Sequence, residues 1–433
     1  PIWVVLLLAS CVVDYTSSRL MGTTENQRTR KLLLGVSLTF NLGLLGTYKY
    51  YDFFLESIRA GLASVGILSP DHAMPFLDVA LPVGISFYTF QTMAYTIDCY
   101  RRDREPIKNF ITFAAFVTFF PQLVAGPIVL SQELVPQMES KPRVTREQIS
   151  DGVFLLLKGL IKKVAIADWI GINLVDRLYD NPGIFSSAEV LVGLIGYSMQ
   201  IYADFSGYTD MAIGSAKLFG YELPENFRRP YQAKTVAEFW RTWHMTLSKW
   251  VRTYIYFPLG GTRGGPVRTY VNLMASILIM GIWHGANWTF FWYGILHGCA
   301  VGLNRYFNQK RKAAGKEEQH LNALGVIWRV AATFTFVCLA RILFRSENIH
   351  QAWVITKQLC GTQWTLGMLP NSILWVLALT YAVHFTPIAW ADRAKELFRA
   401  VPPVGKGIIL GIVCGYMVHL ANTQPVPFIY FQF

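Results

Sequence analysis

The side chain best suited to chemistry is His284, which lies within the long apolar run 272–298. An ionisable side chain is costly at membrane depth, and one that is kept there predicts a functional site. A neutral imidazole in an apolar cavity can take the proton from a hydroxyl group that attacks an acyl carbonyl. The alternative is that His284 is a hydrogen-bonded packing residue. His297, in a second His-Gly pair, is expected near a helix end in a structural role.

A second group of candidates lies in the polar, aromatic-rich segment 235–256, which the spacing predicts to be one amphipathic helix. Thr235 is expected to cap it, with Glu238 three residues on as in a capping box. Intervals of three, four and four residues would place one set of polar residues on a shared face. This set is Arg241, His244, Ser248 and Arg252, with Trp243 among the aromatic residues of the other faces.

The shared face has two readings. It could line a site and offer a histidine and two cations to an anionic substrate. Alternatively, the segment is an interfacial helix with snorkelling arginines and an aromatic belt.

Asp204 and Asp210, six residues apart, are expected to pair with an arginine or to cap a broken helix. Asn287, three residues after His284, is a further candidate for substrate contact.

Several established catalytic patterns do not occur. There is no G-x-S-x-G elbow and no S-x-x-K, so a covalent serine mechanism has no support. There is no H-E-x-x-H and no Cys/His ligand spacing, so no metal is expected. The six cysteines form no C-x-x-C pair, and neither a disulfide framework nor a metal site is expected. The simplest chemistry is direct acyl transfer, with one histidine as the base and another polar group orienting the substrate or an oxyanion.

The elements that must position these residues are helices in a membrane. Of the 433 residues, 53% are hydrophobic and only 15% charged, whereas soluble domains carry about a quarter charged residues. Repeated apolar runs predict an all-α polytopic membrane protein with about nine to eleven spans, some segments being re-entrant or interfacial. The net charge of +12 comes from basic residues in short loops between these runs. It fits anionic headgroups or a phosphorylated substrate, and no nucleic acid is expected.

Proline and glycine predict where the helices are interrupted. Pro82 and Gly84 are expected to break one helix, and Pro121, Gly126 and Pro127 another, at positions that are buried in protein or line a wet cavity. The alternative is a simple proline kink between packed helices. Residues 187–205 and 207–220 are predicted as separate apolar segments. The first run, 2–13, is too short to span a membrane and lacks the basic region of a signal peptide. It is therefore expected to belong to a truncated or processed first segment.

Five stretches of the chain resemble the membrane-bound O-acyltransferase family. They are LPVGISFYTFQTMAYTIDCYRR (81–102), YADFSGYTDMAIG (202–214), ENFRRPY (225–231), EFWRTWHMTLSKWVRTYIYFPLGG (238–261) and MGIWHGANWTFFWYGILHG (280–298). Within the family they look most like the bacterial branch that contains the membrane subunit of alginate O-acetyltransferase. The resemblance covers roughly residues 30–430 and implies one membrane domain over 1–433, with its core at about 80–300.

The resemblance implies a helical fold around a central funnel, with His284 as the base and His244 as its partner. It also implies that acetyl passes from a cytoplasmic donor, expected to be acetyl-CoA with no bound cofactor, to an extracytoplasmic acetyltransferase partner. That partner would modify an exported polysaccharide such as alginate, at the bacterial inner membrane. Arg241 and Arg252 are expected to contact donor phosphates, with Ser248, Trp243 and Asn287 nearby. Many relatives have R-D-Y where this chain has Arg252-Thr253-Tyr254, so an acidic residue is missing.

Three other functions are compatible with the sequence. The chain could transfer a D-alanyl group, taken from a carrier-protein thioester, to a cell-wall polymer. It could also be a polymer transporter, which would predict paired structural repeats that the sequence does not show. Finally, it could be a scaffold for a polysaccharide-synthesis complex, in which case His284 would matter only for packing.

Overall fold

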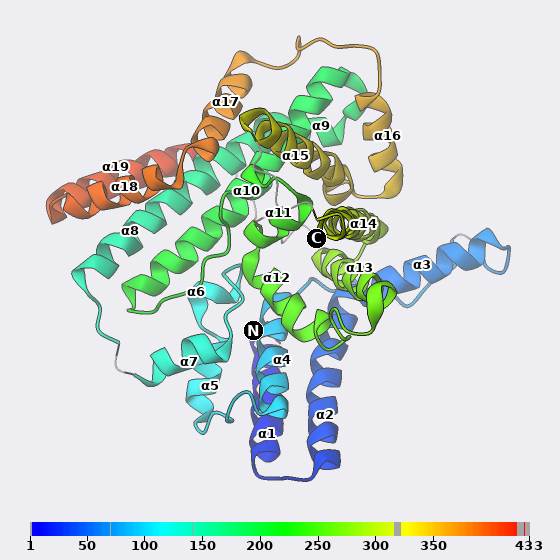
Figure 1. Cartoon of the computed structure of the whole chain (residues 1–433), viewed down its shortest axis with the longest axis vertical. Coiled ribbons are helices and arrows are strands. Elements are labelled where there is room, and N and C mark those ends of the chain that lie inside the picture. Colours follow the sequence, from blue (N-terminus) through cyan, green and yellow to red (C-terminus); the bar gives the residue numbers. More distant parts are fainter. Residues whose placement is uncertain (1, 70, 141, 316–321, 422–427, 429–433) are drawn as a thin grey trace. The chain divides into compact units, whose positions relative to one another are not determined.

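The computed structural model describes residues 2–69, 71–140, 142–315, 322–421 and 428. These residues form nineteen α-helices, joined by short 3-10 and π-helical turns and loops, and no strands (Figure 1). The predicted all-α fold is therefore confirmed. In lipid, a helix satisfies the backbone hydrogen-bonding groups within one segment, which is why the apolar runs take this form.

Four of the described helices are long and apolar enough to cross a membrane. They are α1 (Ile2–Gly22), α13 (Gly265–His284), α15 (Ala323–Arg345) and α19 (Pro403–Ala421). A fifth span results if α17 (Asn371–Phe385) and α18 (Ile388–Ala400), bent by 92°, count as one. The larger predicted number of spans stays a prediction.

The expectation that the first run is too short to span a membrane is wrong, because α1 extends past residue 13 to Gly22 and is long and apolar enough to cross one. The polar residue that seemed to end the apolar run, Asp14, is fully buried within the helix. Asn41 Nδ2 donates to both of its carboxylate oxygens at 2.9 Å, and Ser37 Oγ donates to one of them. These hydrogen bonds offset the cost of burying a carboxyl group, so the helix continues through it.

The chain divides into two compact units. The first consists of Pro1–Pro142 with Gly285–Asn287, and the second of Arg143–His284 with Trp288–Phe433. The expectation of a single domain over 1–433 stays a prediction. In the first unit, α1 packs against α2 (Gln27–Leu45) and α4 (Ile85–Arg101). The predicted interruption at Pro82 and Gly84 is confirmed, because α4 begins directly after Gly84. Gly126 follows the short α6 (Phe120–Leu123), which α5 (Phe110–Val117) precedes, so the second interruption is also confirmed there, whereas Pro121 lies within α6.

The centre of the second unit is the pair α8 (Arg146–Leu160) and α10 (Ser187–Leu218), which lie side by side (Figure 1). Glycines allow the backbones of α8 and α10 to approach closely at two positions along the pair. A Cβ atom on Gly214 would lie 2.7 Å from the Gly152 carbonyl oxygen, and one on Gly207 would lie 2.8 Å from that of Gly159. The predicted break at 206–207 is wrong, since α10 runs unbroken for 32 residues. Gly207 serves close helix packing and does not end the helix.

Lysines of α8 and of the π-helical segment that follows it neutralise the two aspartates of α10. Asp204 pairs with Lys163 at 2.7 Å, and Asp210 pairs with Lys158 at 3.0 Å and with Lys162 at 2.7 Å. The expectation that these carboxylates are paired is confirmed, although the partners are lysines and not arginine. The pairing allows a helix with two interior carboxylates to be buried.

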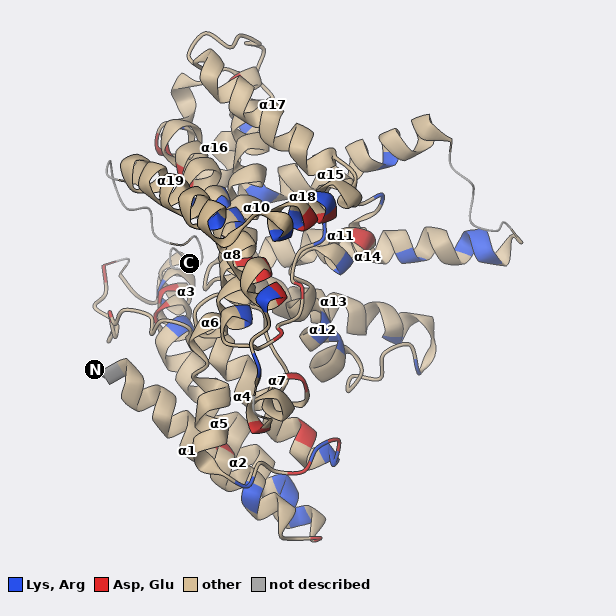
Figure 2. Cartoon of the chain, turned by 90° about the vertical axis from the view of Figure 1, so that its left-hand side faces the viewer, with Lys and Arg blue, Asp and Glu red and all other residues tan. Residues whose placement is uncertain are grey.

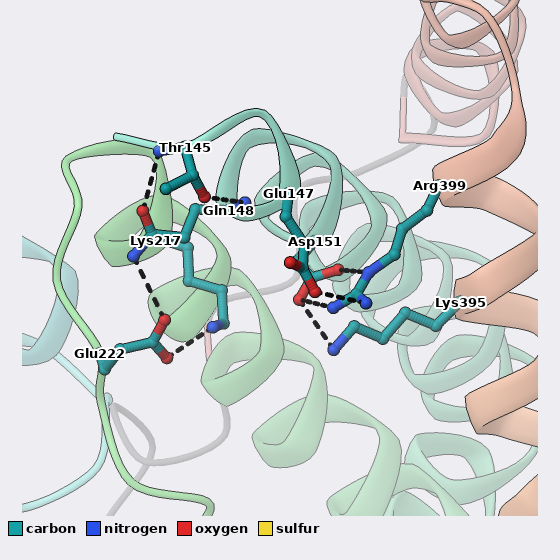
Figure 3. A network of polar contacts seen from close by, with 8 residues as sticks. All are labelled: Thr145, Glu147, Gln148, Asp151, Lys217, Glu222, Lys395 and Arg399. Carbon is teal, nitrogen blue, oxygen red and sulfur yellow. Dashed lines mark hydrogen bonds and ion pairs between the residues drawn. The ribbon is translucent and has the colours of Figure 1, made fainter. Parts of the chain in front are cut away.

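A second ionic cluster joins α8 to α18. Asp151 on α8 accepts two hydrogen bonds from Arg399, at 2.6 and 2.8 Å, and pairs with Lys395 at 2.8 Å (Figure 3). Glu147, one turn earlier, also contacts Arg399. Charged residues gather on α8, on α18 and at the C-terminal end of α14 (Trp288–Ala313), whereas α17 carries none (Figure 2).

Candidate active site

His244 lies at a break between two short helices, α11 (Val236–Thr242) and α12 (Met245–Val251). Its backbone is left-handed, with φ 44° and ψ 57°. The prediction of one continuous helix over 235–256 is therefore wrong. The predicted cap is confirmed, because Thr235 Oγ1 accepts from the Glu238 amide at 3.1 Å. The Glu238 carboxylate accepts from the Lys234 amide instead of closing a full capping box.

The segment that precedes α11 stabilises this break. The Met245 amide donates to the Asn226 carbonyl oxygen at 2.9 Å, and the Arg228 amide donates to the Thr242 carbonyl oxygen at 2.9 Å. These bonds satisfy backbone groups that a continuous helix would have paired internally. Tertiary contacts thus outweigh the local helical pattern, which is why periodicity alone did not predict the break.

Asn226 also determines which nitrogen of His244 carries the proton. Its Oδ1 lies 3.1 Å from His244 Nδ1 and accepts from the Thr246 amide at 3.2 Å and from the Thr246 hydroxyl at 2.9 Å. The Thr246 amide can only donate, so the amide group of Asn226 must present its oxygen here. An amide oxygen only accepts, and His244 Nδ1 is therefore the protonated nitrogen. The lone pair of the neutral ring is on Nε2.

Burial keeps the His244 ring neutral. Both His244 and Asn226 are fully buried. Desolvation disfavours the charged imidazolium and lowers the pKa of His244 from 6.5 to about 3. At neutral pH this residue is thus an uncharged acceptor in an aromatic environment, with the Phe205 ring edge-on at 4.7 Å.

His284, the last residue of α13, lies in the same aromatic group and is 2% exposed. The Trp283 ring is 5.2 Å from the ring of His284 and 6.0 Å from that of His244. On another side, the Phe344 ring lies 5.2 Å from His284. The structure therefore gathers the two predicted histidines around one indole ring.

The break at His244 separates the other predicted residues of this segment. Arg241 lies on α11 and is exposed, whereas Ser248 lies on α12 and Arg252 begins the π-helical turn after it. Because the chain turns at His244, the one shared face predicted for these residues does not exist. Neither arginine forms an ion pair with a described acidic residue. Asn287 lies in the Gly285–Asn287 link of the first unit, and its proximity to the histidines stays a prediction.

Trp243 is part of the core and is 3% exposed. Its ring stacks on Phe239 at 5.5 Å with an interplanar angle of 17°. The guanidinium of Arg341 lies 4.7 Å from its ring centroid. Arg341 and Arg345 flank a late apolar run, which predicts a position near a membrane interface. That depth stays a prediction, but Arg341 is 1% exposed and is therefore buried within the protein. In the sequence, only the position of Arg341 near the end of this apolar run, four residues before Arg345, indicated a buried cation.

His297 is fully buried and lies well inside α14 (Trp288–Ala313), so the expectation that it lies near a helix end is wrong. Its Nδ1 accepts from Trp240 Nε1 at 3.1 Å, so its proton is on Nε2. This hydrogen bond ties α14 to α11, the helix that leads to His244. Among the described residues, no three His, Cys, Asp or Glu side chains form a group that could hold a metal ion.

Comparison with known proteins gives a consistent family. The sequence model of the membrane-bound O-acyltransferase family matches residues 70–344. The chain is 40% identical to a probable alginate O-acetylase of Pseudomonas syringae pv. tomato over 335 residues, 76% of this chain and 60% of that protein. It is 34% identical to the Pseudomonas putida protein of the same name over 440 residues, 95% of this chain and 86% of that protein. It is 35% identical to the peptidoglycan O-acetyltransferase of Helicobacter pylori over 383 residues, 82% of this chain and 70% of that protein.

Proposed function

The chain belongs to the membrane-bound O-acyltransferase family, and on this premise we propose that it is a histidine-dependent acetyltransferase that serves an exported polysaccharide. The observation that carries the proposal is the gathering of His244 and His284 around Trp283. A buried imidazole that is neutral has a free lone pair, so it can accept a proton directly, without first being deprotonated. Membership of the family indicates acyl transfer, and the arrangement of the two histidines provides a general base for that reaction.

The roles of the two histidines follow from acyl-transfer chemistry. We propose that His284 removes the proton from the acceptor hydroxyl while the oxygen of that hydroxyl attacks the acetyl carbonyl. The carbon–oxygen bond forms, the thioester carbon–sulfur bond breaks, and the thiolate leaves and is protonated. His244, with Nδ1 bound to Asn226, offers Nε2 as a hydrogen-bond acceptor to a second, neighbouring hydroxyl of the acceptor molecule and so orients the molecule that attacks.

The donor in this proposal is acetyl-CoA on the cytoplasmic side of the bacterial inner membrane, used as a substrate with no cofactor bound. The exposed cations Arg241 and Arg252 suit its phosphates. Ser248 suits a polar donor group, since its hydroxyl is buried and has no partner among the described residues. The burial of Trp243 favours a packing role over direct donor contact. A central funnel would connect the donor to an extracytoplasmic acetyltransferase partner.

The exported polymer that finally receives the acetyl group has two candidates. Alginate is favoured by two relatives named probable alginate O-acetylases, one of which matches 95% of this chain. A peptidoglycan glycan strand is the second candidate, because a relative of similar identity is named peptidoglycan O-acetyltransferase. D-alanyl transfer to a cell-wall polymer differs in its donor, a carrier-protein thioester. A transporter or scaffold would require no acyl chemistry at all.

The test is the O-acetyl content of exported polymer in cells that carry wild type, His284→Ala or His244→Ala at matched levels of inserted protein. We expect His284→Ala to abolish acetylation and His244→Ala to reduce it by roughly 10²-fold or more, as for a lost acid–base group. His350→Ala, an exposed histidine on α16 (Ile349–Leu359), is the control and should retain the wild-type content.

Two outcomes would redirect the proposal. Unchanged acetylation in His284→Ala would contradict the histidine mechanism and favour a transport or scaffold role. Incorporation of alanine ester in place of acetyl would identify D-alanyl transfer. Release of free thiol from acetyl-CoA by isolated membranes, absent with His284→Ala, tests the donor separately from the polymer.

A further inference from the structure

Arg341 on α15 is a buried cation without an acidic partner among the described residues. It is 1% exposed. Its Nη1 donates to the Ser198 carbonyl oxygen at 2.9 Å and to the Tyr231 hydroxyl at 2.7 Å. Its guanidinium lies 5.3 Å from the Tyr231 ring centroid and 4.7 Å from that of Trp243. Aromatic faces and neutral oxygens thus take the place of a carboxylate.

Such an arrangement is costly to maintain. A buried charge without a counter-ion costs more than an apolar side chain of the same volume, which would fill this position without a desolvation penalty. A flat guanidinium does what an apolar side chain cannot, because it donates in fixed directions while it stacks on an aromatic ring. The ring it holds most closely is that of Trp243.

Trp243 is the residue immediately before His244, and its indole is held on several sides. Phe239 stacks on it, and Phe227 meets it edge-on at 5.0 Å with an interplanar angle of 83°. The next residue, His244, has a left-handed backbone, which is uncommon for any residue that carries a Cβ atom. Such a conformation persists only when its neighbours fix it, and the anchored indole is the neighbour on its N-terminal side.

We propose that Arg341 is a positioning residue that holds the His244 imidazole in place through the indole of Trp243. The inference rests on the proposed role of His244 in acetyl transfer. It assigns to α15 a part in acyl transfer that does not require contact with substrate. Ser198 and Tyr231 fix the guanidinium, the guanidinium fixes the indole, and the indole fixes where the chain turns.

A matched control lies one helical turn further along α15. Arg345 pairs with Asp176 at 3.0 Å and stacks on Tyr179 at 5.2 Å, so it makes similar contacts away from Trp243. The test compares wild type, Arg341→Met, Arg341→Lys and Arg345→Met in two measurements. One is polymer acetyl content per amount of folded protein. The other is the rate at which diethyl pyrocarbonate modifies His244 in detergent-solubilised protein, followed by mass spectrometry.

We expect Arg341→Met to lose about tenfold or more in acetylation, since a desolvated cation–π contact and two hydrogen bonds are removed. Modification of His244, fully buried in the wild type, should become about tenfold faster as the indole loosens. Arg341→Lys keeps a cation over the indole but loses the planar donor geometry, and should recover part of both effects. Arg345→Met should match the wild type in both measurements. If Arg341→Met fails to fold, Trp243→Phe takes its place in the test. This variant keeps a weaker cation–π partner, so it should acetylate less than wild type and its His244 should be modified faster.

Equal His244 modification rates in Arg341→Met and Arg345→Met would overturn the proposal, whatever happens to activity. So would a loss of acetylation in Arg341→Met that only follows the amount of folded protein. Failure of the proposed function is a different result. If His244→Ala acetylates normally while Arg341→Met still speeds His244 modification, Arg341 positions His244 but His244 has no part in the transfer.

Discussion

The side-chain oxygen of Asn226 lies 3.1 Å from Nδ1 of His244 and accepts two further hydrogen bonds, both from Thr246. One amide group thereby performs two tasks. It stabilises the N-terminus of α12 after the helix break, and it selects the tautomer that leaves the lone pair on His244 Nε2. The backbone carbonyl of the same asparagine accepts from Met245, so one residue contributes to both the break and the tautomer.

Replacing Asn226 by aspartate should therefore change the pH dependence of acetyl transfer. Burial holds the pKa of His244 at about 3 in the wild type, so this ring stays neutral from pH 8 down to pH 5. A carboxylate at 226 keeps the acceptor but favours the imidazolium, which raises the pKa of His244. Loss of activity on the acid side should then begin at a higher pH in Asn226→Asp than in the wild type.

The measurement is acetyl release from acetyl-CoA by isolated membranes between pH 4.5 and 8. Asn226→Ala is the companion variant. It should lower activity at all pH values, without moving the acid limb upward, and destabilise the protein by about 1–3 kcal/mol because buried donors lose their acceptor. Superimposable acid limbs for the wild type and Asn226→Asp would show that His244 does not need to be neutral for transfer.

The sequence predicted the helical class and the cap at Thr235 because both depend on local or compositional properties. A run of apolar residues must be helical in lipid wherever it packs, and the Thr235 cap needs only residues three positions apart. The W-H-G and W-H motifs likewise identified His284 and His244 before their surroundings were known. Their gathering around Trp283 joins two segments 40 residues apart, and only the structure shows it.

The predictions that failed depend on tertiary contacts. The break at His244 is stabilised by Asn226 and Arg228, which lie outside the predicted helix. Gly207 was taken as a helix breaker, although it serves close approach to Gly159. Arg341 was expected near an interface because it flanks an apolar run, and its burial within the protein was not predicted. Its aromatic and carbonyl partners come from three other segments of the chain.

Asp151 should make stability depend on pH through the link between α8 and α18. Burial raises the pKa of its carboxyl, but hydrogen bonds from Arg399 and Lys395 outweigh this and lower it below the ordinary value of 3.8. A carboxyl whose pKa is lower in the folded state stabilises the protein above the unfolded pKa. This contribution is lost as the pH falls from about 4 through the folded value.

Asp151→Asn tests this link. It should cost about 1–3 kcal/mol at pH 7, because Arg399 and Lys395 lose a buried partner, and should flatten the acid side of the curve of Tm against pH in detergent. Glu147→Gln is the control: it also contacts Arg399, but its side chain is 62% exposed, so the change should stay within about 0.5 kcal/mol. A Tm for Asp151→Asn equal to that of Glu147→Gln would show that the ionic cluster does not stabilise the fold.

Gly159 should not tolerate a methyl group. A Cβ atom at this position would lie 2.5 Å from the Gly207 carbonyl oxygen and 3.0 Å from the Met211 amide nitrogen, both backbone atoms of α10. Gly159→Ala must therefore push the two helices apart, and we expect a loss of at least about 2 kcal/mol, as for other overpacked cores. Gly43→Ala on α2, with nothing within 4 Å of the added atom, should instead raise stability by up to about 1 kcal/mol. Thermal unfolding in detergent micelles compares the two, and a neutral Gly159→Ala would show that the interface is looser than the glycine contacts imply.

The Trp240–His297 hydrogen bond should be structural and separable from acetyl transfer. Trp240 Nε1 donates to His297 Nδ1 at 3.1 Å between α11 and α14, and both side chains are buried. His297→Phe leaves a buried indole donor without its acceptor and should cost about 1–3 kcal/mol, and Trp240→Phe should cost a similar amount. In the double variant neither the Trp240 indole N–H nor the His297 Nδ1 is left without its partner. The loss in free energy of unfolding should therefore be smaller than the sum of the two single losses by about 1 kcal/mol or more. All three variants should retain acetylation per folded protein within a few-fold of wild type. A loss of transfer in His297→Phe as complete as in His284→Ala would instead place His297 in the chemistry.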